Sequence, residues 1–145
     1  MKPLNRKESG NLGESQVFTK LVSLGHTVEY PEARNQEGYD LIISDTKKKI
    51  EVKHIQRSGS ASRDSFILKK AQAKLDAFDN LILLVRDYGI DNSKYYIFSY
   101  QEIQNIISNK KTSSGNFTFN LNKDGTELAS IDLFPFQDQW QKIKN

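Results

Sequence analysis

The most constraining feature of the sequence is an uninterrupted apolar run, Leu-Ile-Leu-Leu-Val, at residues 81–85. A run of strand length without polar alternation is typical of a β-strand buried on both faces, and such strands lie in sheets that contain parallel pairs. Residues 66–78 precede this run and carry apolar residues at helical spacing: Leu68, Ala71, Leu75 and Phe78. Because parallel neighbours need a crossover connection, we expect a helix over about residues 66–78 and an α/β fold.

The remaining pattern adds helices and strands on both sides of this run. Before it we expect a helix over residues 11–24 ended by Gly25, a strand over 26–30 and a polar loop over 31–38. After it we expect a strand over 94–100, a helix over 101–108 with Ile103, Ile106 and Ile107 inward, a hairpin over 117–133 that turns at 122–125, and an amphipathic C-terminal helix with Trp140 and Ile143. This order predicts a mixed sheet with helices on both faces.

Length and composition narrow the class of protein. A chain of 145 residues can bury roughly 70% of its unfolded surface as one domain, so we expect a single domain over residues 1–145. The absence of cysteine excludes disulfides and thiolate zinc sites, so a metal would bind oxygens or His26 and His54. No apolar run approaches the roughly 20 residues needed to span a bilayer, and no signal-peptide core is evident, so a cytoplasmic location and no membrane contact are expected.

The charge of the chain permits a polyanionic partner without requiring one. The net charge is +3, and lysines cluster at residues 47–49, 69–74 and 110–111. Such clusters are often only solvated surface, so charge alone leaves the function open.

Two strand-like runs, residues 39–44 and 49–55, are close enough in sequence to form a β-hairpin. If its loop is centred between residues 45 and 46, Asp40 lies opposite Glu51, with their Cβ atoms about 5 Å apart. Lys53 then points to the same face. Opposed carboxylates repel by roughly 3 kcal/mol at an effective dielectric constant of about 20, and a divalent cation would relieve this repulsion. The hairpin therefore predicts a Mg²⁺ site with a lysine that can act on attacking water.

Structural interpretations of the same residues remain open. Glu51 and Lys53 also fit an exposed strand pair, and a shift of one residue in register would separate Asp40 from Glu51. Glu14 fits two roles, because Asn11 and Glu14 have the spacing of a capping box, while Glu14 also lies on the apolar stripe of its helix.

In chain order, Gly13-Glu14, residues 38–43 (GYDLII) and residues 50–53 (IEVK) resemble the PD-(D/E)xK nuclease superfamily, most of all its archaeal-type Holliday-junction resolvases. The resemblance covers about residues 10–107, departs from the pattern at Tyr39 where proline is usual, and leaves the tail from residue 110 unexplained. It implies a restriction-endonuclease-like αβββαβ core. The hydrophobic pattern of the sequence adds a C-terminal β-hairpin and helix over about residues 110–145.

The resemblance also implies the activity and the residues that carry it. Asp40, Glu51 and the Val52 carbonyl would hold Mg²⁺, or Mn²⁺ in its place, Lys53 would be catalytic, and Glu14 would be a supporting acid. The implied protein is a homodimeric, metal-dependent endonuclease that hydrolyses DNA, with Holliday junctions as one expected substrate and no small-molecule cofactor. Restriction, repair and mobile-element endonucleases are alternatives within the same superfamily.

Residues after the second strand are candidates for DNA contact. Arg57, Arg63, Lys69 and Lys70 are placed to reach phosphates, because the loop over residues 57–64 leaves the strand that carries Glu51 and Lys53. Some members of the superfamily carry a functional glutamine or lysine on the next helix, where this sequence has Gln72 and Lys69, with a surface helix glutamine as the alternative for Gln72.

His54 should face away from Lys53, because neighbouring residues of a strand alternate in direction, so it is not expected to be a ligand.

Two other classes of protein compete with a nuclease. A non-catalytic DNA-binding module could retain the same fold, although the complete acid-acid-lysine set argues against it. A small-molecule α/β enzyme is disfavoured, because no glycine-rich phosphate loop follows a strand and no Ser/His/Asp grouping is present.

Overall fold

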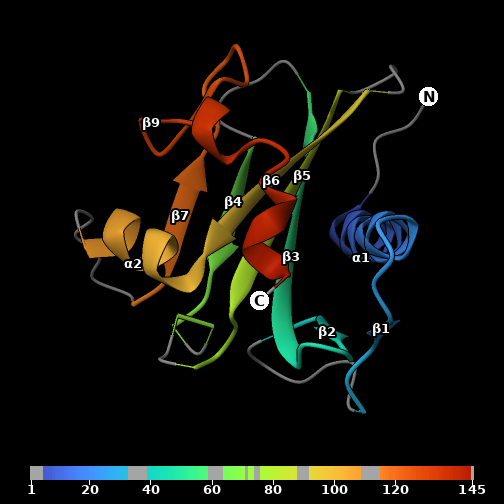
Figure 1. Cartoon of the computed structure of the whole chain (residues 1–145). Coiled ribbons are helices and arrows are strands. Elements are labelled where there is room, and N and C mark those ends of the chain that lie inside the picture. Colours follow the sequence, from blue (N-terminus) through green and yellow to red (C-terminus); the bar gives the residue numbers. More distant parts are fainter. Residues whose placement is uncertain are drawn as a thin grey trace.

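The core of the computed structural model is a five-stranded mixed sheet with the strand order β1-β2-β3-β5-β6 (Figure 1). The structure describes residues 5–32, 39–58, 64–70, 72–73, 76–87, 92–108 and 115–144. The five strands are β1 (Val28–Glu29), β2 (Leu41–Ile43), β3 (Lys48–Arg57), β5 (Asn80–Asp87) and β6 (Ser93–Ser99).

The apolar run at residues 81–85 forms an interior strand of this sheet with a parallel neighbour, as predicted. It lies in β5, which pairs in parallel with β3 and antiparallel with β6. Every residue from Asn80 to Val85 is buried, because both faces of β5 are covered. The expected strands at 26–30, 39–44, 49–55 and 94–100 are all present, with bounds shifted by a few residues.

Helices cover the two faces of the sheet (Figure 1). On one face, Val17 and Leu21 of α1 (Arg6–Ser23) pack with Ile82 and Leu84 of β5. On the other face, α2 (Tyr100–Ser108) contributes Ile103, Ile106 and Ile107, the three residues that the sequence predicts to be inward. The fold is therefore the predicted α/β fold with a mixed sheet flanked by helices.

Helix α1 begins five residues earlier than predicted. Its N-cap is Asn5, whose side chain accepts a hydrogen bond from the Glu8 N–H, while the Glu8 side chain accepts from the Asn5 N–H. The capping-box interpretation of Asn11 and Glu14 is therefore wrong, because both lie inside the helix. The predicted end is confirmed, since Gly25 has φ of 97°, in the left-handed region that favours glycine after a helix.

The helix expected over residues 66–78 is wrong. Residues Ser65–Leu68 form a strand, β4, which pairs antiparallel with β7 (Phe117–Asn120) in a separate two-stranded sheet. Phe66 stacks on Phe119 with ring centroids 4.7 Å apart, so pairing with a strand some 50 residues later overrides the helical spacing. After β4, a hydrogen bond from the Gln72 N–H to the Lys69 carbonyl closes a turn.

The C-terminal residues differ in part from the predicted hairpin. The turn at residues 122–125 is present, but β7 pairs with β4, and the hairpin is formed by β8 (Glu127–Leu128) and β9 (Ile131–Asp132). The expected C-terminal helix is limited to two short 3-10 helices, η1 (Phe134–Phe136) and η2 (Trp140–Ile143), with Ile143 buried.

The same C-terminal residues lie along the free edge of β6. The Asp138 N–H donates to the Tyr95 carbonyl at 3.0 Å, and the Lys142 Nζ donates to the Ile97 carbonyl at 3.1 Å. Between these contacts Tyr96 forms a β-bridge with Gln137. The outward carbonyls of β6 at these two positions are therefore occupied from within the chain.

No helix in the described part of the chain is both long and apolar enough to cross a membrane.

Candidate active site

The hairpin of β2 and β3 places the two predicted acids next to each other. Leu41 pairs with Ile50, which confirms the predicted register, and the Asp40 N–H donates to the Ile50 carbonyl at 2.8 Å. Asp40 therefore lies opposite Glu51, one residue beyond the end of β2. Its Oδ2 accepts a hydrogen bond from the Val52 N–H at 2.8 Å, which fixes the carboxylate against β3.

Glu51 is a buried acid with a perturbed pKa. It is only 2% exposed, on the sheet face opposite α1. Burial raises the pKa of Glu51 well above its ordinary value, repulsion from Asp40 raises it further, and Lys53 acts in the opposite direction. A raised pKa caused by burial and a second carboxylate is a feature of functional sites that bind protons or cations.

Lys53 and Gln72 complete this cluster. The Lys53 Nζ lies 3.5 Å from Glu51 Oε1, with the lysine side chain 16% exposed. The Gln72 Nε2 donates to the same oxygen of Glu51 at 3.1 Å, and its Oε1 lies 3.5 Å from the Lys53 Nζ. Gln72 is half-buried and lies within this cluster, and its functional role stays a prediction.

The donor set fits a hard divalent cation. Within the described residues, Glu51 Oε2 is buried without a hydrogen-bond partner, although a buried carboxylate oxygen is costly unless it is paired. The Val52 carbonyl points to the same side of β3 as that of Ile50, toward Asp40, because strand residues two apart repeat their orientation. Among the described residues no three His, Asp or Glu side chains lie close enough together to hold a metal ion by themselves. Two carboxylates and a carbonyl are nevertheless sufficient for Mg²⁺, which keeps several waters.

His54 lies on the other face of β3, as predicted. Its Nδ1 lies 2.9 Å from both the hydroxyl and the carbonyl oxygen of Ser9 in α1, and burial lowers the pKa of the imidazole. A Cβ at Gly13 would lie 2.7 Å from the His54 Cβ, so glycine is needed where α1 crosses β3. Glu14 follows in the same helix and is half-buried. Its role as a supporting acid stays a prediction.

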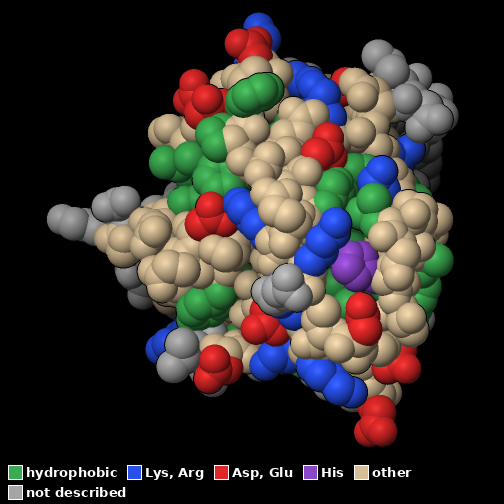
Figure 2. All heavy atoms as spheres, in the orientation of Figure 1, with side chains coloured by type: hydrophobic (Ala, Val, Ile, Leu, Met, Phe, Trp, Pro, Cys, Tyr) green, Lys and Arg blue, Asp and Glu red, His purple; other side chains and the backbone are tan. Residues whose placement is uncertain are grey.

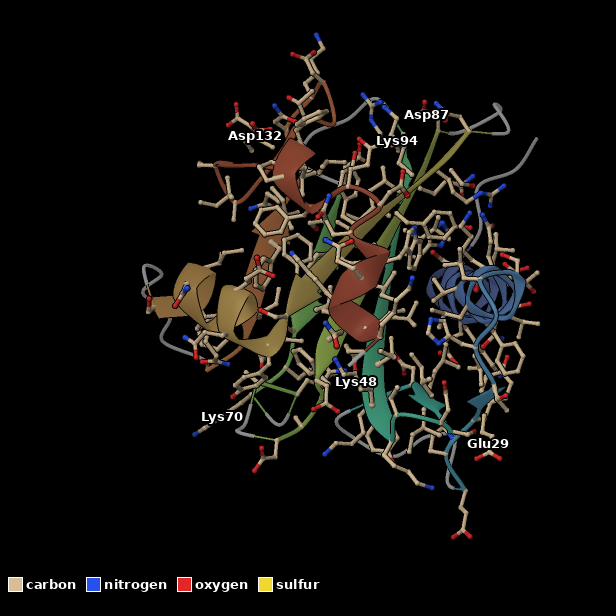
Figure 3. The ribbon with its side chains drawn as sticks, in the orientation of Figure 1. Glu29, Lys48, Lys70, Asp87, Lys94 and Asp132 are labelled. Carbon is tan, nitrogen blue, oxygen red and sulfur yellow. The ribbon has the colours of Figure 1, made fainter. Side chains whose placement is uncertain are left out.

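The candidate DNA contacts have different surroundings. Arg57 is tied into the protein, because its Nη1 pairs with Asp87 at 2.9 Å and its Nη2 donates to the Lys123 carbonyl at 2.7 Å. Lys69 and Lys70 are exposed, and the Lys70 side chain projects into solvent (Figure 3). Arg63 lies outside the described residues. DNA contact by each of these residues stays a prediction.

Charges of both signs are interspersed on the visible face of the molecule rather than gathered in one basic patch (Figure 2).

Two polar side chains for which the sequence predicts no role accept hydrogen bonds from segments near the site. Asp64 is 2% exposed, and its Oδ1 accepts hydrogen bonds from the N–H and the hydroxyl of Ser58. Asn116 Oδ1 accepts from the Lys70 N–H at 3.1 Å. The sequence carries little signal for either, since Asp64 bonds a serine six residues before it and Asn116 bonds the main chain 46 residues away.

Comparison with known proteins identifies a related fold. No protein-family model matches the chain, and no curated protein matches it. The chain is similar to the solved structure of a bacterial homing endonuclease, I-Ssp6803I, with a TM-score of 0.63 and 14% identity, over 95% of this chain and 92% of that one. Because the match covers 95% of this chain, it includes most of residues 110–145, the tail that the resemblance to resolvases leaves unexplained. The chain therefore has the fold of this endonuclease over nearly its whole length.

Proposed function

We propose that this protein is a Mg²⁺-dependent endonuclease that hydrolyses DNA at the site of Asp40, Glu51 and Lys53. The observation that carries the proposal is the pair of adjacent carboxylates, one of them buried with an unpartnered oxygen, beside a lysine amine at 3.5 Å. The structural similarity to a homing endonuclease supports this proposal independently.

Each residue has a distinct task in this proposal. Asp40, Glu51 and the Val52 carbonyl would hold the ion, and the Val52 N–H keeps Asp40 in place. A Mg²⁺ ion held there, or Mn²⁺ in its place, would lower the pKa of a bound water and neutralise charge on the scissile phosphate. The Lys53 amine orients the attacking water and stabilises negative charge on the phosphate oxygens.

The resemblance to resolvases and the structural similarity suggest different DNA substrates. The sequence motifs favour a Holliday junction cut by a homodimer, in which two sites address two strands. The similarity to a homing endonuclease, which extends into the C-terminal tail, favours a mobile-element type of enzyme that cuts a duplex site. The two hypotheses assign the same chemistry to the site and differ in the shape of the DNA substrate.

A cleavage assay tests the proposal. Purified protein is incubated with a four-way junction, linear duplex and supercoiled plasmid, with Mg²⁺, Mn²⁺ or EDTA. We expect cleavage of at least one substrate with either ion and none in EDTA. Asp40→Asn and Lys53→Ala should each abolish it, because one removes a ligand and the other removes the amine.

Matched controls come from the same chain. Asp45→Asn changes an exposed acid in the turn of the same hairpin, and Lys94→Ala changes an exposed lysine of β6, which β5 separates from β3. Both should cut like the wild type.

Cleavage that persists in Asp40→Asn and Lys53→Ala would refute the site. If the protein binds DNA but neither cuts it nor takes up Mn²⁺, it is instead a non-catalytic DNA-binding module.

A further inference from the structure

Strands β4 and β7 form a two-stranded antiparallel ribbon outside the main sheet, which we call the β4–β7 ribbon. Its inner face carries Phe66 and Phe119, which are stacked and buried. Because side chains alternate along a strand, the residues between and beside them form an outer face: Ser65, Ile67, Thr118 and Asn120. Three of these four side chains are exposed and none is charged, so the ribbon presents a neutral face to solvent.

The ribbon lies beside the candidate active site. Of its two strands, β4 is the one nearer to β3 (Figure 1). The Lys53 Nζ is 6.0 Å from the centre of the Phe66 ring, and the turn that follows β4 contacts Glu51. At this end of β4 the chain continues into the exposed Lys69 and Lys70. DNA with a phosphate at Lys53 would therefore pass along β4, where two lysines are placed for its neighbouring phosphates.

The ribbon is held at both ends by hydrogen bonds. At one end the Leu121 N–H donates to the Asp64 carbonyl at 2.8 Å. At the other end the Lys70 N–H donates to the Asn116 Oδ1 at 3.1 Å. The outer face therefore has a fixed shape before any partner arrives.

The shape and chemistry of this face fit the major groove of DNA. That groove is about 12 Å wide and admits a two-stranded β-ribbon. Within it an asparagine amide can bond both N6 and N7 of adenine, and an apolar side chain can contact the methyl group of thymine. Asn120 supplies the amide, and Ile67, which is 44% exposed, supplies the apolar contact.

We infer that the β4–β7 ribbon enters the major groove beside the cut and reads bases there, with Ile67 against a thymine methyl and Asn120 on an adenine. This inference rests on the proposed function. Asn120 lies diagonally across the ribbon from Ile67, and diagonal neighbours in a sheet are about 7–8 Å apart. Base pairs are about 3.4 Å apart along the helix, so the adenine lies roughly two base pairs from the thymine. The substrate is therefore a duplex site of preferred sequence.

Replacement of thymine by uracil tests the contact with Ile67, because uracil forms the same base pair and lacks only the 5-methyl group. The cut sites of the wild type are first mapped on plasmid DNA with Mg²⁺. Duplexes that carry the preferred site are then made with single deoxyuridine substitutions. At one thymine within a few base pairs of the cut, we expect kcat/KM to fall about four-fold, the loss that corresponds to one methyl group returned to water. Ile67→Ser should cut the thymine and uracil duplexes equally, because its short polar side chain cannot reach the methyl group.

Ile131→Ser is the matched control, because Ile131 is an exposed isoleucine in another short strand, β9, outside the ribbon. It should keep the preference of the wild type for thymine. Both variants should take up Mn²⁺ with the affinity of the wild type, measured by calorimetry, because neither residue belongs to the proposed metal site.

Asn120→Ser tests the second contact independently. The cut sites of the wild type should share an adenine roughly two base pairs from the thymine. The variant should lose a preference of about 5- to 150-fold for that adenine, the range of a good bidentate contact to a base. It should remain sensitive to uracil, because Ile67 is unchanged.

Three results would overturn the inference. A wild type that cuts without base preference, or that cuts every uracil duplex like the thymine duplex, would show that the ribbon reads no bases. Equal loss of the thymine preference in Ile131→Ser and Ile67→Ser would place recognition outside the ribbon. Sedimentation in which Ile67→Ser alone dissociates a dimer, with base preference unchanged, would make the ribbon a contact between copies. Each of these results leaves the proposed function standing, whereas a wild type that neither takes up Mn²⁺ nor cuts DNA refutes that function itself.

Discussion

Replacement of Gly13 by alanine tests how closely α1 lies against the strand of the candidate site. The new Cβ would lie 2.7 Å from the Cβ and 3.3 Å from the Cγ of His54. Real Cβ contacts are essentially never so short, and the His54 Cβ cannot move without β3. Gly10, in the same helix, has nothing within 4 Å of an added Cβ and is the matched control.

The two substitutions share one favourable term and differ in the clash. Alanine is favoured over glycine inside a helix by about 1 kcal/mol, so Gly10→Ala should stabilise the protein by up to that amount. At Gly13 the same gain is opposed by overpacking, which typically costs about 1–3 kcal/mol. Gly13→Ala should therefore be less stable than Gly10→Ala by about 1–3 kcal/mol. For a chain of this size, each kcal/mol corresponds to roughly 2–4 °C in melting temperature.

Thermal and urea unfolding, followed by circular dichroism, measure this difference directly. We expect Gly10→Ala to melt above the wild type and Gly13→Ala to melt several degrees below Gly10→Ala. Equal melting temperatures for the two variants would refute the close approach of α1 to β3.

Two further predictions concern stability. Burial, and then repulsion from Asp40, raise the pKa of Glu51 in the folded state. The folding stability that protonated Glu51 contributes is therefore fully present below its ordinary pKa of 4.5 and is lost as pH rises through the pKa of the folded state. In EDTA, Glu51→Gln should therefore lose less stability than the wild type as pH rises from 4 to 8, and parallel urea-unfolding curves would contradict this. Asn5→Ala should cost about 1 kcal/mol, because it removes the N-cap of α1, whereas Asn11→Ala should not destabilise; equal melting temperatures would contradict the observed helix start.

The sequence predicts best what local pattern decides. The register of the β2–β3 hairpin is set by a short loop and by apolar residues such as Leu41 and Ile50, which must share one face, so the position of Asp40 opposite Glu51 could be deduced. The apolar run in β5 indicates an interior place in the sheet, because a strand without polar residues must be covered on both faces.

The sequence predicts poorly what distant segments decide. Phe66 and Leu68 fit both a helical stripe and the inner face of a strand, and only the partner strand β7 selects the strand. The contact of Gln72 with Glu51 depends on the turn that follows this strand, so a helical interpretation could not reveal it. The start of α1 is ambiguous for a different reason, because Asn5 and Asn11 are each followed three residues later by a glutamate and offer the same capping spacing.

The contacts along β6 limit how copies of this protein can associate. An exposed edge strand is a template for pairing with another chain, and proteins commonly cover such edges. Here Asp138 and Lys142 occupy the carbonyls of Tyr95 and Ile97, so a second molecule cannot extend the sheet at these positions without displacing them. A homodimer that addresses two DNA strands would therefore join through another surface and not through a continuous sheet across β6.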